Sequence, residues 1–253
     1  DEDAGISYGH EVKKILDTLD RPAAGFITES LLSCGGQVIP PKAYFKTAFK
    51  HVRDNGGLCI VDEVQTGFGR VGTHFWGFEM QEVIPDIVVL GKPIGNGHPM
   101  SAVITTRDIA QRFANGMEFF ATFGGNPVSC AIGMAVLDVI EEEGLQAHAL
   151  HVGTRMLTGL EKLKDRHPII GDIRGTGLFI GIELVLDRQT RLPATRKAAE
   201  VANRMKNRGI LLGTDGPFNN VIKIKPPMVI TKDDADMFVR VLDDVLTVME
   251  ASA

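Results

Sequence analysis

The segment Asp86–Pro99, DIVVLGKPIGNGHP, places a lysine and a glycine-rich loop directly after a short apolar run. The apolar residues Ile87–Leu90 end at Gly91, and Lys92 follows. A short apolar run bounded by such residues is typical of a buried strand. We therefore predict a strand at Ile87–Leu90, with Lys92 just beyond its end.

Two other apolar runs have the same character. The first, Ala23–Ile27, has Glu29 shortly after it, and the second, Leu58–Val61, is followed at once by Asp62. A helical pattern that starts at Pro40 separates them. Nearly continuous apolar strands that alternate with helices indicate an α/β sheet covered on both faces.

Charged residues capable of ligand binding or catalysis lie at the ends of the predicted strands. Open α/β sheets bind ligands beyond the carboxyl ends of their strands, and Glu29, Asp62 and Lys92 each fall at such an end. The next apolar segment, Ser101–Thr105, follows after only a few residues. A parallel neighbour needs a crossover of about a dozen residues, so we expect this segment to run antiparallel at one side of a mostly parallel sheet.

The composition changes near Leu145. A helix is predicted from Pro127 to Gly144, and helical and β-like segments alternate after it. The last helix begins at Thr231, with Asp234 in the position of a capping-box partner. We predict two domains, residues 1–145 and a smaller α+β domain at residues 146–253.

Charge and composition narrow the classes of partner. The net charge is −5 and the basic residues are dispersed, so no basic stripe for nucleic acid is expected. No apolar run approaches the roughly 18 residues of a membrane span. We therefore expect a small-molecule substrate rather than a nucleic-acid or membrane partner. The three cysteines lack CxxC spacing and the first residues do not resemble a signal peptide, so we expect a reducing compartment, the cytoplasm.

A lysine and an aspartate beyond neighbouring strands have a known chemical use. A lysine amine that is partly deprotonated forms a Schiff base with an aldehyde. An ionised aspartate keeps a pyridine nitrogen protonated, which makes pyridoxal phosphate an electron sink. The same two residues, Asp62 and Lys92, also suit a structural ion pair. The residues alone leave both interpretations open.

Longer stretches resemble one enzyme family. The segments IVDEVQTGFGRVG (Ile60–Gly72), PDIVVLGKPIGNGHPMSAV (Pro85–Val103) and TFGGNPVSCAIGMAVLDVI (Thr122–Ile140) resemble, in this order, the signature segments of class III aminotransferases. The resemblance continues through Asp172–Leu184 and Asn220–Leu246. It implies the aspartate-aminotransferase fold, with residues 1–145 as part of a large domain that binds pyridoxal 5'-phosphate and residues 146–253 as a small C-terminal domain.

The resemblance also implies roles for individual residues around the cofactor. Lys92 matches the Schiff-base lysine that also carries protons to and from the cofactor. Asp62 matches the partner of the pyridine nitrogen, and Gln65 a group near the phenolic oxygen. Thr122 matches a hydroxyl that reaches the cofactor phosphate of the partner subunit, which implies a homodimer.

Substrate contacts are implied at two positions. Glu29 matches a residue close to the substrate side of the cofactor. Arg174 matches an arginine that binds a substrate carboxylate through paired hydrogen bonds, although an arginine in this position also suits bracing between domains. His148 and His151 have no third ligand in a recognisable pattern, so no metal site is expected.

Two reactions and one non-catalytic state follow from the family pattern. Transamination is the common activity of the family, so it is our first expectation. The segments Thr28–Phe45, Gly91–Pro99 and Leu211–Pro227 resemble a branch that includes ethanolamine-phosphate phospho-lyases, whose leaving phosphate requires nearby cations. The candidate cations are Arg70, Arg174, Lys223 and Lys225. Because the family's N-terminal part is not recognisable, we expect a C-terminal portion of a member, and a non-catalytic fragment is the third alternative.

Overall fold

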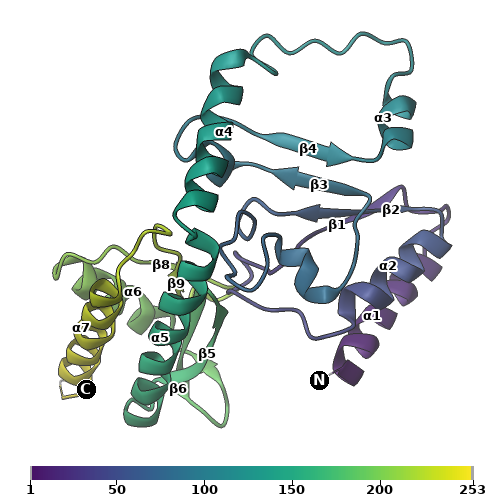
Figure 1. Cartoon of the computed structure of the whole chain (residues 1–253). Helices are drawn as coiled ribbons and strands as arrows, with labels where there is room; N and C mark the ends of the chain where they lie inside the picture. Colours follow the sequence, from purple (N-terminus) through teal and green to yellow (C-terminus); the bar gives the residue numbers. More distant parts are fainter. Residues whose placement is uncertain (1, 252–253) are drawn as a thin grey trace. The chain divides into compact units, whose positions relative to one another are not determined.

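The computed structural model describes residues Glu2–Ala251, and Asp1, Ser252 and Ala253 lie outside it. The chain forms two compact units (Figure 1). The first comprises residues 2–30, Pro40–Phe68 and His74–Gly144, and the second comprises Leu31–Ile39, Gly69–Thr73 and residues 145–251. The units are therefore not contiguous in sequence. The division into a cofactor-binding domain and a small domain at Leu145 stays a prediction.

The first unit contains a four-stranded sheet in the order β1-β2-β3-β4. Its strands are β1 (Gly25–Glu29), β2 (Leu58–Asp62), β3 (Ile87–Leu90) and β4 (Ala102–Thr105). β1, β2 and β3 are parallel and β4 is antiparallel to β3. The predicted α/β class and the antiparallel last strand are confirmed. The strand expected at Ala23–Ile27 begins two residues later, because the pairing with β2 starts at Gly25 opposite Leu58.

α2 (Tyr44–Asp54) packs against this sheet, and α1 (Glu2–Asp17) packs against α2. The buried residues Phe49 and Cys59 join α2 to β2. Burial raises the pKa of the Cys59 thiol to about 11. α2 begins later than the predicted start at Pro40, because Ala43 has a left-handed backbone (φ +67°) that is incompatible with a continuing helix.

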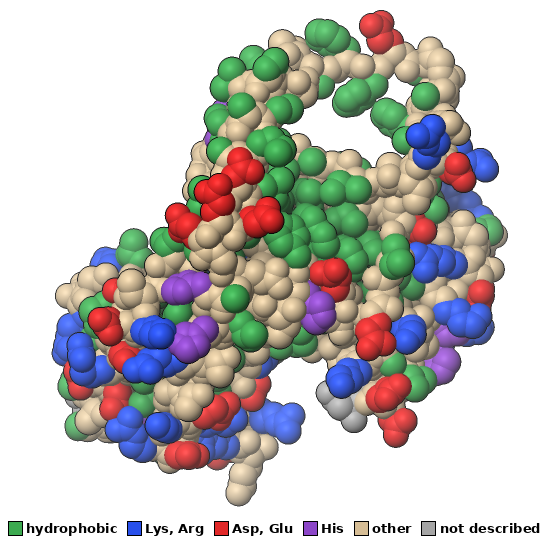
Figure 2. Space-filling model, viewed as in Figure 1, with side chains coloured by type: hydrophobic (Ala, Val, Ile, Leu, Met, Phe, Trp, Pro, Cys, Tyr) green, Lys and Arg blue, Asp and Glu red, His purple; other side chains and the backbone are tan. Residues whose placement is uncertain are grey.

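The rest of the first unit consists of two single-turn helices and two α-helices. They are η1 (Gly77–Gln81), η2 (Lys92–Gly95), α3 (Arg107–Phe113) and α4 (Pro127–Glu142). α4 starts at Pro127 as predicted, and the side chain of its N-cap Asn126 accepts a hydrogen bond from Ser129 N. Only Gly133 of α4 is buried, and hydrophobic side chains gather on the visible surface of this unit (Figure 2).

The second unit is an antiparallel sheet packed against helices. Its elements are α5 (Leu145–Arg166), β5 (Ile170–Thr176), β6 (Phe179–Asp187), β7 (Leu192–Pro193), α6 (Thr195–Lys206), β8 (Gly213–Asp215), β9 (Val221–Ile224) and α7 (Lys232–Ala251). The strand order is β5-β6-β9-β8. Alternate residues of β6, Ile180, Ile182 and Leu184, join the core that the helices cover, as expected for one face of a strand.

α7 begins with the predicted cap. Asp234 N donates to Thr231 Oγ1 (3.1 Å), and the Asp234 carboxylate accepts from Thr231 N and Oγ1. These bonds lower the pKa of Asp234. Further along this helix, Phe238, Leu242 and Leu246 are buried in the core of the unit.

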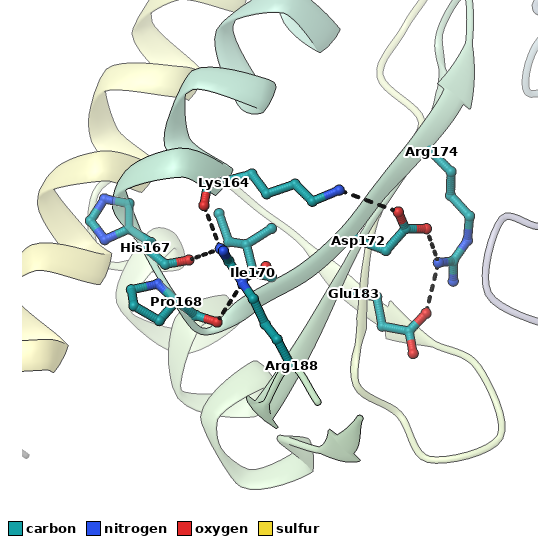
Figure 3. A network of polar contacts seen from close by, with 8 residues as sticks. All are labelled: Lys164, His167, Pro168, Ile170, Asp172, Arg174, Glu183 and Arg188. Atoms are coloured by element: carbon teal, nitrogen blue, oxygen red, sulfur yellow. Dashed lines mark hydrogen bonds and ion pairs between the residues drawn. The ribbon is translucent and has the colours of Figure 1, made fainter. Parts of the chain in front are cut away.

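Arg188 caps the carboxyl end of α5. Its guanidinium donates to the carbonyl oxygens of Lys164, His167, Pro168 and Ile170 (Figure 3). The last carbonyl oxygens of a helix lack hydrogen-bond donors within the helix. The Arg188 side chain supplies donors at this end of α5. None of the helices between Glu2 and Ala251 combines the length and the apolar character needed to cross a bilayer.

The segment Asp172–Leu184 lies within a β-hairpin. β5 and β6 meet at Gly177, whose φ is +53°. Gly153 of α5 packs directly on this turn, and a Cβ added at Gly153 would overlap the carbonyl oxygen of Gly177. This contact therefore requires glycine in the middle of α5.

We expect Gly153→Ala to lower the free energy of unfolding by roughly 2–3 kcal/mol, because backbone atoms have no room to move aside. Gly133→Ala in α4 is the matched control, since its Cβ would meet the mobile end of Met100 at 2.9 Å. There the change should be neutral or stabilising by up to about 1 kcal/mol. Urea unfolding of both variants measures the difference, and equal effects would contradict the prediction.

The backbone at Lys92 is strained. Lys92 follows Gly91 at the start of η2 and has φ +38°, in the left-handed region that favours glycine. A non-glycine residue held there costs of order 1–3 kcal/mol. Strain of this kind persists only where the surrounding structure fixes the backbone.

Lys92→Gly should therefore be more stable than Lys92→Ala by about 1 kcal/mol, although both variants lack the amine. Glu118 has no positive φ, so the pair Glu118→Gly and Glu118→Ala should show the opposite order. Thermal unfolding of the four variants compares them. The same order at both positions would show that the Lys92 backbone is not strained.

Candidate active site

The register of the parallel strands brings three candidate residues to one edge of the sheet. Glu29 pairs with Asp62 across β1 and β2. Asp62 in turn pairs with Val89 across β2 and β3, and Lys92 follows Val89 by three positions. Parallel strands lie about 4.8 Å apart. Glu29, Asp62 and Lys92 therefore extend from neighbouring strand ends, as the sequence predicts.

Asp62 presents a carboxylate oxygen that residues 2–251 do not use. The side chain is half-buried, and its Oδ1 accepts a hydrogen bond from Val64 N (2.8 Å). Within residues 2–251, Oδ2 has no protein partner. One oxygen therefore orients the carboxylate while the other is available to a ligand.

Lys92 is exposed and its amine is not engaged by the described part of the chain. No ion pair joins Lys92 to Asp62 among those residues. The structural ion pair that the sequence left open is therefore not formed. An amine that forms no ion pair is free to react with an aldehyde.

Sequence reasoning assigned no role to Glu63, which the structure places at the base of this edge. Its side chain is fully buried and accepts four hydrogen bonds. The only local signal is Thr66, a hydroxyl three residues later. The other donors come from Ser30, Gly77 and Phe78, which are remote in sequence.

Gln65 and Thr122 lie in different surroundings. Gln65 is half-buried and lies in the turn directly after β2. Thr122 is exposed in a turn before α4, within the exposed stretch between α3 and α4. Gln65 thus lies near Asp62 along the chain. The cofactor-binding roles of both residues stay predictions.

Arg174 belongs to the second unit and is already engaged there. Its Nε donates to Gly36 O (2.9 Å), and its Nη1 contacts Asp172 (2.9 Å) and Glu183 (2.7 Å). Figure 3 shows the guanidinium beside these two carboxylates. A substrate carboxylate would compete with both. The predicted substrate-binding role of Arg174 stays a prediction.

The other cations considered for a leaving phosphate also have partners in the second unit. Lys223 pairs with Asp215 at 3.0 Å, and Lys225 donates to Ser33 Oγ at 2.8 Å. Arg70 donates to the carbonyl oxygens of Leu178 and Pro226, and burial lowers its pKa. Of these four groups, Arg174 and Lys223 are paired with carboxylates.

Two histidines, His98 in the loop after Lys92 and His148 in α5, contact other parts of the chain. His98 Nε2 lies 2.8 Å from Ser129 Oγ, at the edge of an open cavity of about 890 Å³ lined by residues 98–102, 123–126, 129 and 130 but by neither Asp62 nor Lys92. His148 Nε2 lies 2.8 Å from Ile230 O, so it bonds to backbone. The ring of His98 therefore contacts the first turn of α4.

The residues present fit pyridoxal phosphate. The cofactor needs an amine for its aldehyde and an anionic partner for its pyridine nitrogen. Lys92 and Asp62 supply these groups from adjacent strands, with the amine and Oδ2 both available. The donor set therefore agrees with the chemistry that this cofactor requires.

Comparisons with known proteins agree with this chemistry. Over 252 residues the chain is 52% identical to a Drosophila melanogaster protein named alanine–glyoxylate aminotransferase 2-like, covering 98% of this chain and 51% of that protein. It is 38% identical to a solved phospholyase from Arthrobacter in complex with phosphoethanolamine, with a TM-score of 0.91 over 94% of this chain and 57% of the other.

A third similarity is to an amine transaminase from an uncultivated Pseudomonas species, solved in its pyridoxal-phosphate-bound form. The identity is 32% and the TM-score 0.88, over 98% of this chain and 57% of the other. The chain thus spans about half the length of the relatives it matches. This agrees with the expectation that it corresponds to part of a longer family member.

A family model described as aminotransferase class-III matches residues 2–246. The match includes the sheet edge with Glu29, Asp62 and Lys92 and extends through the second unit almost to the end of α7. Members of this family use pyridoxal phosphate. With the fold and the strand-end residues, this match shows that the chain belongs to the class-III aminotransferase family.

Proposed function

We propose that the chain is the Lys92-bearing part of a pyridoxal-phosphate-dependent transaminase. The enzyme transfers an amino group between an amine or amino acid and a keto acid. One observation carries the proposal: the amine of Lys92 and the carboxylate of Asp62 extend from adjacent parallel strands without an ion pair between them. Two opposite charges left unpaired at a strand edge suit a ligand that uses both.

Each group has a distinct task in this proposal. When bound, the cofactor supplies an electron sink for a carbanion. Lys92 holds the cofactor covalently and moves a proton at the substrate α-carbon, and Asp62 Oδ2 holds the proton of the ring nitrogen. Gln65 orients the phenolic oxygen. Glu29 lies on the substrate side, and Arg174 binds the substrate carboxylate.

A phospho-lyase is the second candidate. The similar solved phospholyase with phosphoethanolamine favours it. In that reaction the first steps are shared and a phosphate leaves instead of an amino group being transferred. The pairing of Lys223 with Asp215 weighs against it, because it offsets charge that a leaving phosphate requires.

We further propose a homodimer. Thr122, the residue assigned to the partner's cofactor phosphate, lies among exposed aromatic side chains. Phe119, Phe120 and Phe123 are 75%, 79% and 83% exposed. Exposed apolar patches of this kind mark protein interfaces. A partner subunit that covers them would bring Thr122 to its cofactor.

The two units and the cysteines support two smaller proposals. The first unit, which holds Asp62 and Lys92, represents the cofactor-binding domain, and the second unit represents the small domain. All three cysteines are free thiols, and Cys34 and Cys130 are exposed. Exposed free thiols suit a reducing compartment, for which we propose the cytoplasm.

The chain should bind pyridoxal phosphate covalently at Lys92. Addition of the cofactor should give a visible absorbance band, and borohydride reduction followed by peptide mapping should locate the adduct on Lys92. Asp62→Asn should weaken binding while leaving the adduct at the same residue, because it removes only the partner of the ring nitrogen. Lys92→Ala should give no visible band.

Surface lysines provide the internal control, because modification scattered over them would count as non-specific. An absent band in the unsubstituted chain would contradict the proposal. The chain would then be a non-catalytic fragment, which is the third alternative.

Product assays separate the two reactions. A transaminase consumes amino donor and keto acid in equal amounts and releases no inorganic phosphate. Release of phosphate from phosphoethanolamine without a keto acid would replace the transaminase assignment with the phospho-lyase.

A further inference from the structure

Glu63 is the most completely engaged buried charged side chain near the strand edge. Its Oε1 accepts from Ser30 Oγ (2.5 Å) and Phe78 N (2.9 Å). Its Oε2 accepts from Thr66 Oγ1 (2.8 Å) and Gly77 N (3.0 Å). A carboxylate offers about four acceptor positions, so every position is filled and no bond remains for a ligand.

The donors come from separate parts of the first unit. Ser30 directly follows Glu29 at the end of β1, and Thr66 lies in the turn after β2. Gly77 and Phe78 begin η1, where backbone N–H groups lack partners within the helix. One carboxylate therefore joins the ends of two strands and the start of a helix.

The main chain of Glu63 is fixed as well. Its N–H donates to Val89 O of β3 (3.0 Å), and its carbonyl accepts from Gly67 N (2.9 Å) and Thr66 N (3.3 Å). Asp62 precedes it, and Gln65 lies inside the turn that these bonds close. The positions of both candidate cofactor ligands consequently depend on Glu63.

We propose that Glu63 is a positioning residue for the cofactor site. It holds Asp62, Gln65 and Glu29 at the strand edge without touching the ligand, since it is 0% exposed. This inference rests on the proposed function, because it concerns residues assigned to pyridoxal phosphate. It extends that function by adding a layer of support beneath the residues that contact the cofactor.

The substitution Glu63→Gln tests the role with little change in size. An amide has one acceptor oxygen and a donating NH₂ group, so two of the four donors would face another donor. Thr66→Ala removes a single donor, and Thr66→Ser restores it. Phe49→Leu, in the buried cluster of the same unit, is the control for a general loss of stability.

The first measurement uses the cofactor-free chain. Hydrogen exchange of the amides Val64–Phe68 should become at least about tenfold faster in Glu63→Gln, with a smaller effect in Thr66→Ala and none in Thr66→Ser. In Phe49→Leu, exchange of these amides should not increase more than exchange in the rest of the first unit. Unchanged exchange in Glu63→Gln would overturn the inference.

The second measurement follows bound pyridoxal phosphate by absorbance. Glu63→Gln should bind about tenfold more weakly, the size of effect that outer supporting residues have at metal sites, and the pH midpoint of its visible band should shift. Thr66→Ser should keep the original pH midpoint. Phe49→Leu should also keep it, even where its melting temperature falls as far as that of Glu63→Gln. A general structural defect would not shift it.

The outcomes separate this inference from the proposed function. If the unsubstituted chain fails to bind pyridoxal phosphate, the proposed function and the positioning role fall together. If it binds at Lys92 and Glu63→Gln binds equally well with the same midpoint, only the positioning role of Glu63 is overturned.

Discussion

The parallel pairing of β1, β2 and β3 is the constraint on which the candidate site depends. Parallel strands end at the same edge, so residues from three distant parts of the chain come to one edge of the sheet. Glu29 and Asp62 are opposite each other in the register. A shift of one residue would turn these side chains to the other face of the sheet. The register therefore determines which functional groups face a ligand.

The edge is held by burial and hydrogen bonding rather than by pairing of its charges. Apolar side chains such as Phe49 and Val61 fix the sheet against the helices. Glu63 satisfies polar groups where the strands stop. Asp62 and Lys92 are then left without each other as partners. Asp62 and Lys92 remain available to a ligand because the buried polar groups around them form hydrogen bonds with each other.

Much of this arrangement follows from short sequence patterns, since buried parallel strands are continuous apolar runs and the first polar residue marks their ends. Ile87–Leu90 matches β3 at both ends, and Asp62 and Lys92 stand where the pattern puts them. β1 begins two residues later than its composition predicts, because its start is set by pairing of Gly25 with Leu58.

The unpredicted features depend on distant partners. Glu63 meets Ser30 from 33 residues away and Phe78 from 15. The bond between Arg174 and Gly36 O spans 138 residues. A local pattern shows that such a side chain is charged but not which groups surround it.

The composition of the second unit has a consequence for the order in which the chain folds. Leu31–Ile39 belongs to that unit, and its contacts include Gln37 with Asp215 and Ser33 with Lys225, across 178 and 192 residues. At about 5–20 residues per second, a ribosome needs roughly ten to forty seconds to make the second partner after the first. During synthesis this short segment must wait while the strands on either side of it already have neighbours, so completion of the second unit comes last.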